Sequence, residues 1–347
     1  MSEENTGRKR RGSGRATIHD VAREAQVGSI TVSRYFKQAD RVSDTLRVRI
    51  AAAIKKLNYV PNLVAGGLAS THGRIVGMVI PNISGPIFAN TIQSFSDVLT
   101  LHGYQLLLAS SYFSSAQEEN AIRTFLGWSP SALVVTGQYH TKASEQLLAA
   151  ANIPVVETWD YQPKRKPVQV GFSHYQVGVQ ATKYLIGKGY RRIAFVQNSV
   201  AGDESALDRR DGYVATMREH QLEPWMFLPT AATPFDAGKQ AIDALAMRKK
   251  KPAQAIIFAN DNLAASAILA GQRAGLKMPE ECAIVGFGDY ALSSMLLPSL
   301  TTIRPPAKEI GEIAAMRVLE ALGEIPLSKR LQRLNLLECE LIERESA

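Results

Sequence analysis

Cysteine is nearly absent from this chain of 347 residues, which contains only Cys282 and Cys339. Two cysteines cannot form a disulfide framework or a cysteine-based zinc site, and their scarcity favours a reducing compartment. No apolar run approaches the roughly 20 residues that a membrane-spanning helix needs. Residues 1–15 are polar and basic and lack the apolar segment of a secretory signal peptide. We therefore expect a cytoplasmic protein without a membrane partner.

The motifs of common enzymes are also missing. The sequence has no Walker glycine-lysine loop, no His-Glu-x-x-His and no Gly-x-Ser-x-Gly, and its six histidines are scattered. Residues 286–291 fit the Gly-x-Gly-x-x-Ala pattern of dinucleotide-binding folds, but Pro298 follows too soon for the helix that such a site requires. We expect no enzyme, no metal and no cofactor.

The positive charge is concentrated at one end of the chain. Residues 1–60 contain 13 Lys and Arg against 6 Asp and Glu, whereas the other 287 residues contain 27 against 26. Nearly all of the net charge of +8 therefore belongs to the first 60 residues. This asymmetry is typical of a polyanion-binding segment joined to a neutral body. A solvated basic tail is the alternative.

Three short helices are predicted within residues 17–57. Thr17 can cap the first helix with Asp20 as its acidic partner, and a break at Gly28 precedes a second helix over residues 29–36. Ser43 can cap the third, which ends before Pro61. Three helices with a tight first turn predict a helix-turn-helix unit that binds DNA, and a three-helix bundle without a ligand is the alternative.

Two segments resemble the lactose/galactose repressor family. TIHDVAREA at residues 17–25 and TVSR at residues 31–34 resemble its DNA-binding signature, and PNLVAGGL at residues 61–68 resembles its hinge. The resemblance implies a homodimer that binds a pseudo-palindromic operator in double-stranded DNA and acts as a transcriptional regulator, most often a repressor. The DNA-contacting positions that it implies are Thr17, Ser29, Ile30, Thr31, Ser33, Arg34, Tyr35, Asn62 and Leu68.

These positions differ in the contacts expected of them. Ser29 and Ile30 begin the recognition helix, and Arg34 is able to bridge O6 and N7 of a guanine. Leu68 corresponds to the family's leucine lever, which wedges between base steps from the minor groove. Because Gly66 and Gly67 make a poor helix, a plain flexible linker is the alternative to an ordered hinge.

Two residues depart from the family pattern in the turn before the recognition helix. Gln26 stands where the family usually has glycine, and Gly28 stands where it usually has serine. Glycine at a helix N-cap supplies no side-chain oxygen, which costs a few tenths of a kcal/mol relative to serine. A phosphate contact from that serine is also expected to be missing.

The body of the chain alternates apolar strand-like runs with amphipathic helices. This alternation predicts an α/β fold with open parallel sheets, and it matches the two-lobed periplasmic-binding-protein-like core of the family. The predicted strands are 75–81, 104–110, 132–136, 154–159, 192–197, 255–260 and 282–286, and the predicted helices are 86–103, 115–127, 142–152, 176–189, 205–221, 235–248, 261–275 and 308–322.

The domain boundaries follow from these elements. We expect a basic arm at residues 1–15, a helix-turn-helix domain at 16–60, a hinge at 61–73 and an effector-binding and dimerisation core at 74–347. The first lobe of the core is expected at about 74–173 and 304–335, and the second at about 174–303 and 336–347. The short C-terminal end has no heptad extension, which argues against a tetramerising coiled coil.

Ligands of open parallel sheets bind beyond the carboxyl ends of the strands. Residues near those ends, or matched by the resemblance, give the candidate effector site: Asn82, Ser84, Tyr112, Thr136, Trp159, Phe172, Arg209, Asn260 and Asp289. By resemblance Phe172 is an apolar wall, Asn260 a sugar-binding amide and Arg209 the clamping arginine. A cap or turn role is the alternative for each.

Within the family the chain most resembles regulators of gluconate and related sugar-acid use. Residues 132–136 and 153–160 carry this likeness, together with Gly288 where many members have a sugar-gripping aspartate. Loss of that carboxylate removes a like-charge penalty against an anionic ligand, which Arg209 can then hold in a two-pronged pair. In the alternative, Arg209 only neutralises Glu157 and Asp160. A neutral sugar or a purine could then be the effector, and a solute-binding protein is the competing functional class.

Overall fold

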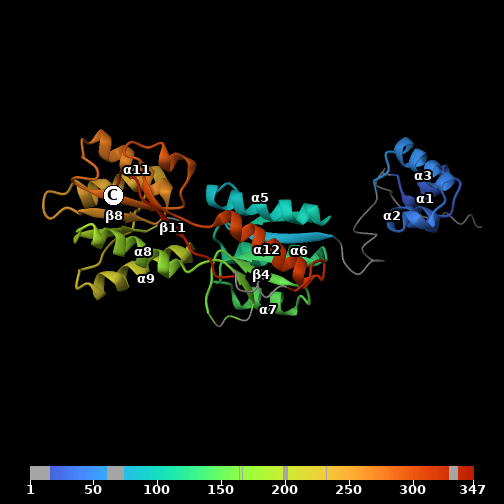
Figure 1. Cartoon of the computed structure of the whole chain (residues 1–347), viewed down its shortest axis with the longest axis horizontal. Helices are drawn as coiled ribbons and strands as arrows, with labels where there is room; N and C mark the ends of the chain where they lie inside the picture. Colours follow the sequence, from blue (N-terminus) through green and yellow to red (C-terminus); the bar gives the residue numbers. More distant parts are fainter. Residues whose placement is uncertain are drawn as a thin grey trace, which may run out of the picture. The chain divides into compact units, whose positions relative to one another are not determined.

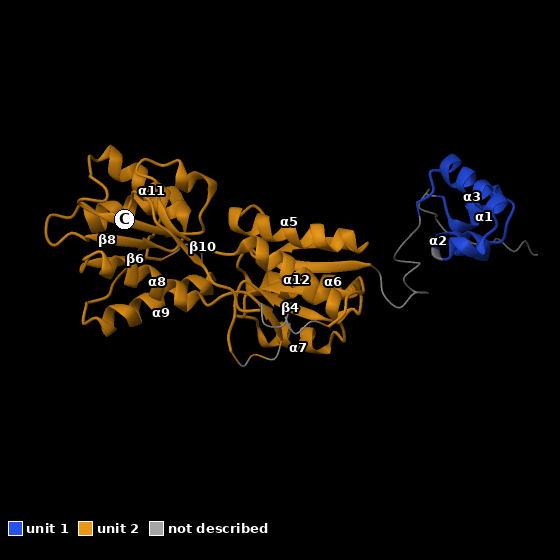
Figure 2. Cartoon of the chain, in the orientation of Figure 1, with its two compact units in different colours: residues 1–73 blue, residues 74–347 orange. Residues whose placement is uncertain are grey.

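A computed structural model describes residues 16–60, 74–163, 165, 167–197, 202–231, 233–327 and 335–347. The chain divides into two compact units, residues 1–73 and 74–347 (Figure 2). The predicted arm and hinge, with Asn62 and Leu68, lie outside the described residues. In the part of the chain that is described, no helix is long and apolar enough to cross a membrane.

Unit 1 is a small helical bundle with its own apolar core. Its elements are α1 (Ile18–Glu24), α2 (Ser29–Lys37), the 3₁₀ helix η1 (Ala39–Arg41) and α3 (Asp44–Lys56). Val21, Val32 and Ile50 are fully buried between the helices. Each helix therefore contributes to one small core.

The helix caps of unit 1 follow the sequence prediction in two cases of three. Thr17 and Asp20 form the predicted capping box. Gly28 is the N-cap of α2 without a side-chain bond, as expected. The predicted capping by Ser43 is wrong, because its hydroxyl makes no cap bond although it stands at the N-cap of α3.

Unit 2 contains two sheets. The first has the order β2-β1-β3-β4-β5, and all of its strands are parallel. The second has the order β11-β10-β9-β8-β6-β7, and only β11 is antiparallel to its neighbour. The strands are β1 (Ile75–Ile80), β2 (Gln105–Ser110), β3 (Ala132–Thr136), β4 (Val155–Thr158), β5 (Val168–Val170), β6 (Ile193–Val196), β7 (Trp225–Phe227), β8 (Ala255–Phe258), β9 (Ala283–Phe287), β10 (Thr301–Arg304) and β11 (Glu340–Ile342).

Helices pack on both sheets, so that unit 2 consists of two lobes, one built around each sheet (Figure 1). Helix α12 follows the last parallel strand of the second lobe but packs against α5, β4 and β5 of the first. The chain then returns to the second lobe, because β11 pairs with β10. The helices of unit 2 are α5 (Pro86–Leu101), α6 (Ser115–Gly127), α7 (Lys142–Ala150), α8 (His174–Gly187), α9 (Glu204–Glu219), α10 (Pro234–Ala241), the π-helix η2 (Ile242–Ala246), α11 (Asp261–Arg273), the 3₁₀ helix η3 (Ala291–Ser294) and α12 (Ala307–Ala321).

Backbone hydrogen bonds join two of the segments that cross between the lobes. The Gly171 amide donates to the Asn335 carbonyl at 3.0 Å, and the Leu337 amide donates to the Gly171 carbonyl at 2.8 Å. The chain after β5 is thus tied to the chain that leads into β11.

The structure confirms the α/β class and differs from the sequence prediction at particular elements. The short strands β5, β7, β10 and β11 are not among the predicted ranges. Strand β7 has an exposed Met226, and β11 is half exposed, so neither gives the continuous apolar run that marks a buried parallel strand. Helix α8 begins two residues earlier than predicted, because Ser173 caps it by accepting from the Gln176 amide.

Candidate functional site

Helix α2 presents an exposed face in unit 1. Val32 is buried against the other helices, whereas Ile30 is 68% exposed and Arg34 is also exposed. Ile30 and Arg34 are four residues apart and therefore lie on one face of the helix. Thr17, which precedes α1, is exposed as well. The remaining candidate positions on α2 are half-buried, namely Ser29, Thr31, Ser33 and Tyr35.

The turn between α1 and α2 is tight and contains a strained residue. Gln26 has a φ of +51°, in the left-handed region that favours glycine. The turn is supported from α3, because the guanidinium of Arg49 donates to the carbonyl of Ala25 at 2.6 Å. Glycine is the residue that the family pattern places at position 26, so this departure introduces backbone strain.

We expect Gln26→Gly to stabilise unit 1 by about 1 kcal/mol, because it removes the cost of a left-handed residue that bears a side chain. Scanning calorimetry of the full-length chain measures the shift of the unit 1 transition. Gln26→Ala is the control: it retains a Cβ in the left-handed region and should give no gain. Equal transitions for the glycine and alanine variants would show that Gln26 is not strained.

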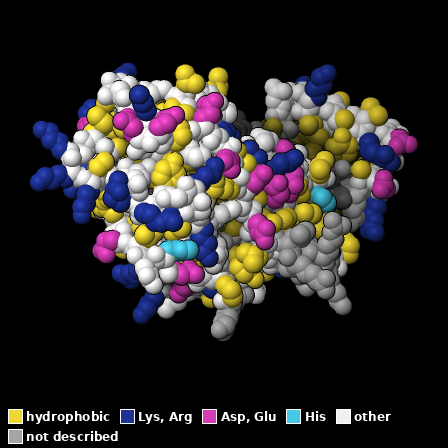
Figure 3. Space-filling view, turned by 60° about the vertical axis from the view of Figure 1, so that its left-hand side comes forward, with side chains coloured by type: hydrophobic (Ala, Val, Ile, Leu, Met, Phe, Trp, Pro, Cys, Tyr) yellow, Lys and Arg dark blue, Asp and Glu magenta, His cyan; other side chains and the backbone are white. Residues whose placement is uncertain are grey.

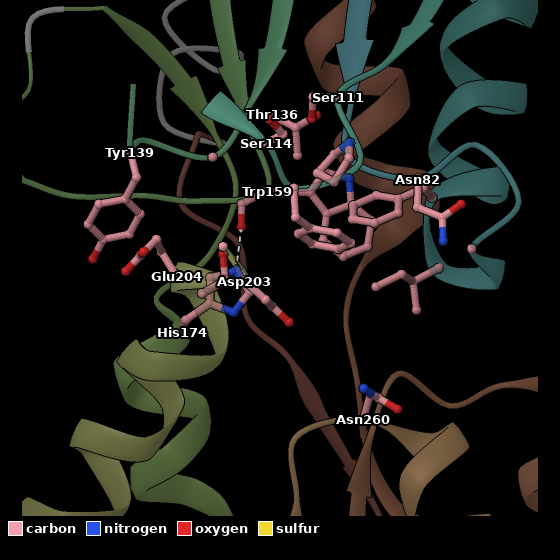
Figure 4. Close-up of a pocket in the computed structure, with 18 of the residues that line it drawn as sticks. Asn82, Ser111, Ser114, Thr136, Tyr139, Trp159, His174, Asp203, Glu204 and Asn260 are labelled. Carbon is pink, nitrogen blue, oxygen red and sulfur yellow. Dashed lines mark hydrogen bonds between the residues drawn. The ribbon is translucent and has the colours of Figure 1, made fainter. Parts of the chain in front are cut away.

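A cavity of about 560 Å³ lies between the two lobes of unit 2. Asn82, Thr136 and Trp159 reach it from the carboxyl ends of β1, β3 and β4, and Asn260 reaches it from the end of β8. Figure 4 shows Asn82, Ser111 and Thr136 on one side of this cavity and Asn260 on the other. Its position follows the rule that open parallel sheets bind ligands beyond the ends of their strands.

One wall of the cavity is aromatic. The ring centroids of Trp159 and Phe88 lie 4.8 Å apart, and both residues line the cavity together with Phe287. Phe172 is 1% exposed and lies behind this wall, where its ring packs against Trp159 and His174. Such a wall suits the carbon skeleton of a small ligand.

Arg209 lines the cavity from α9 and is 5% exposed. Its Nη1 donates to Nδ1 of His174 at 2.8 Å, and its Nη2 donates to the carbonyl of Ala259 at 3.1 Å. The guanidinium also stacks on Phe287, at 4.3 Å from the ring centroid. Burial lowers the pKa of Arg209 from its usual value. Its Nε–H has no hydrogen-bond partner among the described residues.

Two glycines allow α8 and α9 to pack closely enough to bring Arg209 and His174 together. A Cβ on Gly178 would lie 1.9 Å from the carbonyl oxygen of Arg209, and a Cβ on Gly212 would lie 2.0 Å from that of Tyr175. Any larger side chain at either position must therefore separate the helices. The place of Arg209 in the cavity depends on this close contact.

Comparison with known proteins identifies the family. Residues 17–62 match the model of the lacI family of bacterial regulatory proteins, and residues 182–347 match that of a periplasmic binding protein-like domain. The chain is 30% identical over 318 residues to the HTH-type transcriptional regulator GntR of Escherichia coli (strain K12), a match that covers 91% of this chain and 95% of that relative. The chain belongs to the lacI family.

Two further comparisons agree with this membership. The HTH-type transcriptional regulator IdnR of Escherichia coli (strain K12) is 29% identical over 309 residues, or 89% of this chain and 92% of the relative. A LacI-family regulator from Silicibacter pomeroyi superposes with a TM-score of 0.87 at 28% identity, covering 95% of this chain and 99% of that one. The predicted helix-turn-helix unit and periplasmic-binding-protein-like core are confirmed. This lacI-family chain is a DNA-binding transcriptional regulator, and its relatives are regulators rather than enzymes.

The cavity brings together five of the nine effector candidates of this lacI-family protein, namely Asn82, Thr136, Trp159, Arg209 and Asn260. The other four do not line it. Phe172 lies behind the aromatic wall, and Tyr112 is 67% exposed. Ser84 donates through its hydroxyl to Asn82 Oδ1 at 2.8 Å. Asp289 forms ion pairs with Arg304 and Arg344, both at 2.7 Å.

The two asparagines form local hydrogen bonds and also face the cavity. Asn260 Oδ1 accepts from the Leu263 amide and caps α11, and Asn82 Oδ1 accepts from the amide and hydroxyl of Ser84. Because both oxygens are engaged, the side-chain N–H groups are what these residues can offer a ligand. These two residues therefore present hydrogen-bond donors to a ligand rich in oxygen.

Two carboxylates near the cavity are held by partners other than Arg209. Glu157 accepts from Arg165 and Gln169, and Glu118 bonds His140 at 2.9 Å. Burial lowers the pKa of His140, but the bond and charge of Glu118 outweigh burial and raise it above its usual value. The charge of Glu157 is therefore balanced by Arg165 and not by Arg209, which argues against a purely neutralising role for Arg209.

Further acidic groups lie at or near the cavity. Asp203 caps α9 and has a carboxylate oxygen 4.0 Å from Arg209 Nη2, and Glu204 lines the cavity beside it. Burial raises the pKa of Asp160 to about 7.

Several cavity residues were not predicted from the sequence, namely Phe88, His140, His174, Asp203, Phe287 and Tyr290. The residue at position 288 explains why Tyr290 lies in the cavity. Gly288 has a φ of +132°, and a Cβ there would lie 2.3 Å from the Tyr290 ring. Tyr290 therefore fills the space that a side chain at position 288 would need. Tyr290 is also held by the buried Asp261, which accepts from the Tyr290 amide and from the Ser293 hydroxyl.

We expect Gly178→Ala to weaken effector binding at least tenfold and to destabilise unit 2 by about 2 kcal/mol, because the added methyl separates α8 from α9. Calorimetric titration and thermal unfolding of the full-length protein measure the two effects. Gly187→Ala is the matched control in α8, where a Cβ meets no atom within 4 Å. An equal effect of both substitutions would contradict the role of the close contact.

Proposed function

We propose that this lacI-family regulator is a cytoplasmic homodimer, most simply a repressor, whose operator affinity is controlled by a sugar acid bound between the lobes of unit 2. Gluconate and ketogluconates are the sugar acids that we propose as effectors. The observation that carries the proposal is the buried guanidinium of Arg209 on the cavity wall, with a donor that no described group uses.

A buried cation needs a compensating anion, because removing its charge from water is costly. The carboxylate of Asp203 is 4.0 Å from Arg209 Nη2, beyond normal hydrogen-bond length. A ligand carboxylate at the guanidinium supplies charge-assisted bonds, which are about twice as strong as neutral ones. An anionic ligand group at Arg209 is therefore favoured.

The rest of the cavity suits a hydroxylated carbon chain. The N–H groups of Asn82 and Asn260 are available to hydroxyl oxygens, and the Trp159, Phe88 and Phe287 rings pack on the carbon skeleton. The relatives named GntR and IdnR, together with the sequence resemblance to gluconate-type regulators, support a sugar acid.

A neutral sugar is the second candidate, and two of the carboxylates that line the cavity favour it. Asp203 and Glu204 line the cavity and are able to accept bonds from sugar hydroxyls. In that arrangement Arg209 is balanced by Asp203 and does not require an anionic ligand. A purine is a weaker candidate, supported only by the aromatic wall.

For DNA, we propose that α2 enters the major groove with Ile30 and Arg34 towards the bases, because these side chains are exposed on one face. Asn62 and Leu68 remain proposed contacts of the hinge. On the face of the molecule that Figure 3 shows, basic and acidic side chains both occur, in keeping with a body of low net charge. Ser29, at the start of α2, is proposed to face the base edges with Ile30. Thr31, Ser33 and Tyr35 are assigned to the phosphates or to helix packing, and Thr17 remains a proposed DNA contact.

A ligand panel tests the effector class. Calorimetric titration of the full-length protein with gluconate, ketogluconates, glucose, ribose and purines should show binding of at least one acid with an affinity that no neutral compound reaches. Binding of glucose or ribose more tightly than any acid would overturn the sugar-acid proposal and favour the neutral sugar.

A further inference from the structure

We propose that His174 is a positioning residue that aims Arg209 into the cavity without neutralising it. The inference rests on the proposed role of Arg209 in effector binding and adds a second residue to it. His174 is the first residue of α8 and lies between the Trp159 carbonyl of the first lobe and the guanidinium on α9. Figure 4 shows the bond from His174 to Trp159 as a dashed line.

The two contacts define the state of the imidazole. A guanidinium only donates hydrogen bonds and a carbonyl only accepts them, so Nδ1 must accept from Arg209 at 2.8 Å and Nε2–H must donate to Trp159 at 3.1 Å. A protonated ring would direct an N–H at the guanidinium. Burial and the charge of Arg209 lower the pKa of His174 well below its usual value, which agrees with a neutral ring.

Neutrality matters for the ligand. An aspartate at this position would accept from Arg209 equally well, but its charge would cancel that of the guanidinium. A neutral acceptor fixes one nitrogen of the Arg209 guanidinium and leaves its positive charge for an anion. The carbonyl of Ala259, the second anchor, is also a neutral acceptor. Two neutral anchors and the Phe287 ring therefore hold the cation in place.

The acceptor on the other side of His174 is itself held rigidly. Trp159 has a φ of +72°, which is costly for a bulky residue and persists only where the surroundings impose it. Its amide donates to the Val170 carbonyl at 3.0 Å. A Cβ on Gly171 would lie 2.7 Å from the Trp159 carbonyl carbon, so the crossing segments are in close contact there. His174 thus ties the cavity arginine to a rigid point between the lobes.

Three variants of the full-length protein test this role, each titrated with whichever compound of the ligand panel binds the wild type most tightly. His174→Asn retains a neutral acceptor near Nδ1 and should stay within about threefold of the wild-type affinity. His174→Phe fits among Phe172 and Phe287 but cannot accept, and should lose at least tenfold, the usual effect of losing a bond to a charged group. His174→Asp accepts but neutralises Arg209, and should lose at least tenfold for an acid.

The Phe variant separates positioning from packing, because it fills the site but cannot accept. The comparison of the Asn and Asp variants tests the neutrality of the anchor, because the two side chains have nearly the same size. Wild-type affinity in His174→Phe, or equal affinities of the Asn and Asp variants for an acid, would overturn the inference. If the panel shows that the effector is neutral, the sugar-acid proposal fails, and the Phe variant still tests the positioning role.

Nitrogen NMR of the histidine side chains gives a readout that needs no ligand. His174 should show the Nε2–H tautomer and remain neutral from pH 5 to pH 8, and Arg209→Ala should raise its pKa. A protonated ring or the Nδ1–H tautomer at pH 7 would overturn the assignment.

Discussion

A fragment of the protein that begins at Gly73 will fold and bind effector but will lose at least a thousandfold in operator affinity. Unit 1 and unit 2 are separate compact units with separate apolar cores. The helix-turn-helix and nearly all of the net positive charge belong to the part that is removed. Specific DNA binding typically exceeds non-specific binding by 10³-fold or more, so loss of unit 1 removes that whole margin.

The measurement uses an operator selected from random DNA by the full-length protein and compares the two chains by fluorescence anisotropy. Arg34→Ala in the full-length chain is a graded control, which should cost about 1–3 kcal/mol and relax specificity at one base pair. Retention of specific binding by the fragment would place DNA recognition outside unit 1.

Arg209→Ala will lower the affinity for the sugar acid roughly a hundredfold, because two charge-assisted bonds are lost. Arg209→Lys retains the positive charge but cannot form two parallel hydrogen bonds to a carboxylate, and is expected to recover only part of the affinity. Calorimetric titration measures both variants, and thermal unfolding shows that they are folded.

Arg210→Ala is the matched control on the same helix, since Arg210 pairs with Asp211 and does not line the cavity. Its affinity should equal that of the wild type. An unchanged acid affinity in Arg209→Ala would mean that the guanidinium balances Asp203 instead of holding the ligand.

Elements with a continuous apolar run or a clear amphipathic pattern could be predicted from the sequence, and strands without such a pattern could not, including the buried but threonine-rich β10. Strand β3 and helix α6 agree with the predicted ranges at both ends, because one is a continuous apolar run and the other has a clear amphipathic pattern. Strands β7 and β11 lie at the edges of the second sheet, where half-exposed residues give no such pattern. The return of α12 to the first lobe is implied only by the family resemblance.

The candidate site was predictable where it depends on strand ends, and less so where it depends on packing between helices. Asn82, Thr136 and Trp159 follow buried strands, and the structure places them in the cavity. His174 gave no such signal, because it enters the site only through the close contact of α8 with α9 that Gly178 and Gly212 allow. Two glycines so far apart in the chain do not reveal a contact in a single sequence.

The coupling of the two units is tested most directly by measuring operator affinity with and without saturating sugar acid, for the wild type and Arg209→Ala. Because effectors typically couple to a second site by about 1–3 kcal/mol, the acid should change the wild-type operator affinity about 5- to 150-fold, in either direction. The same acid concentration should leave Arg209→Ala unchanged. An operator affinity of the wild type that is identical with and without bound acid would contradict effector control of DNA binding.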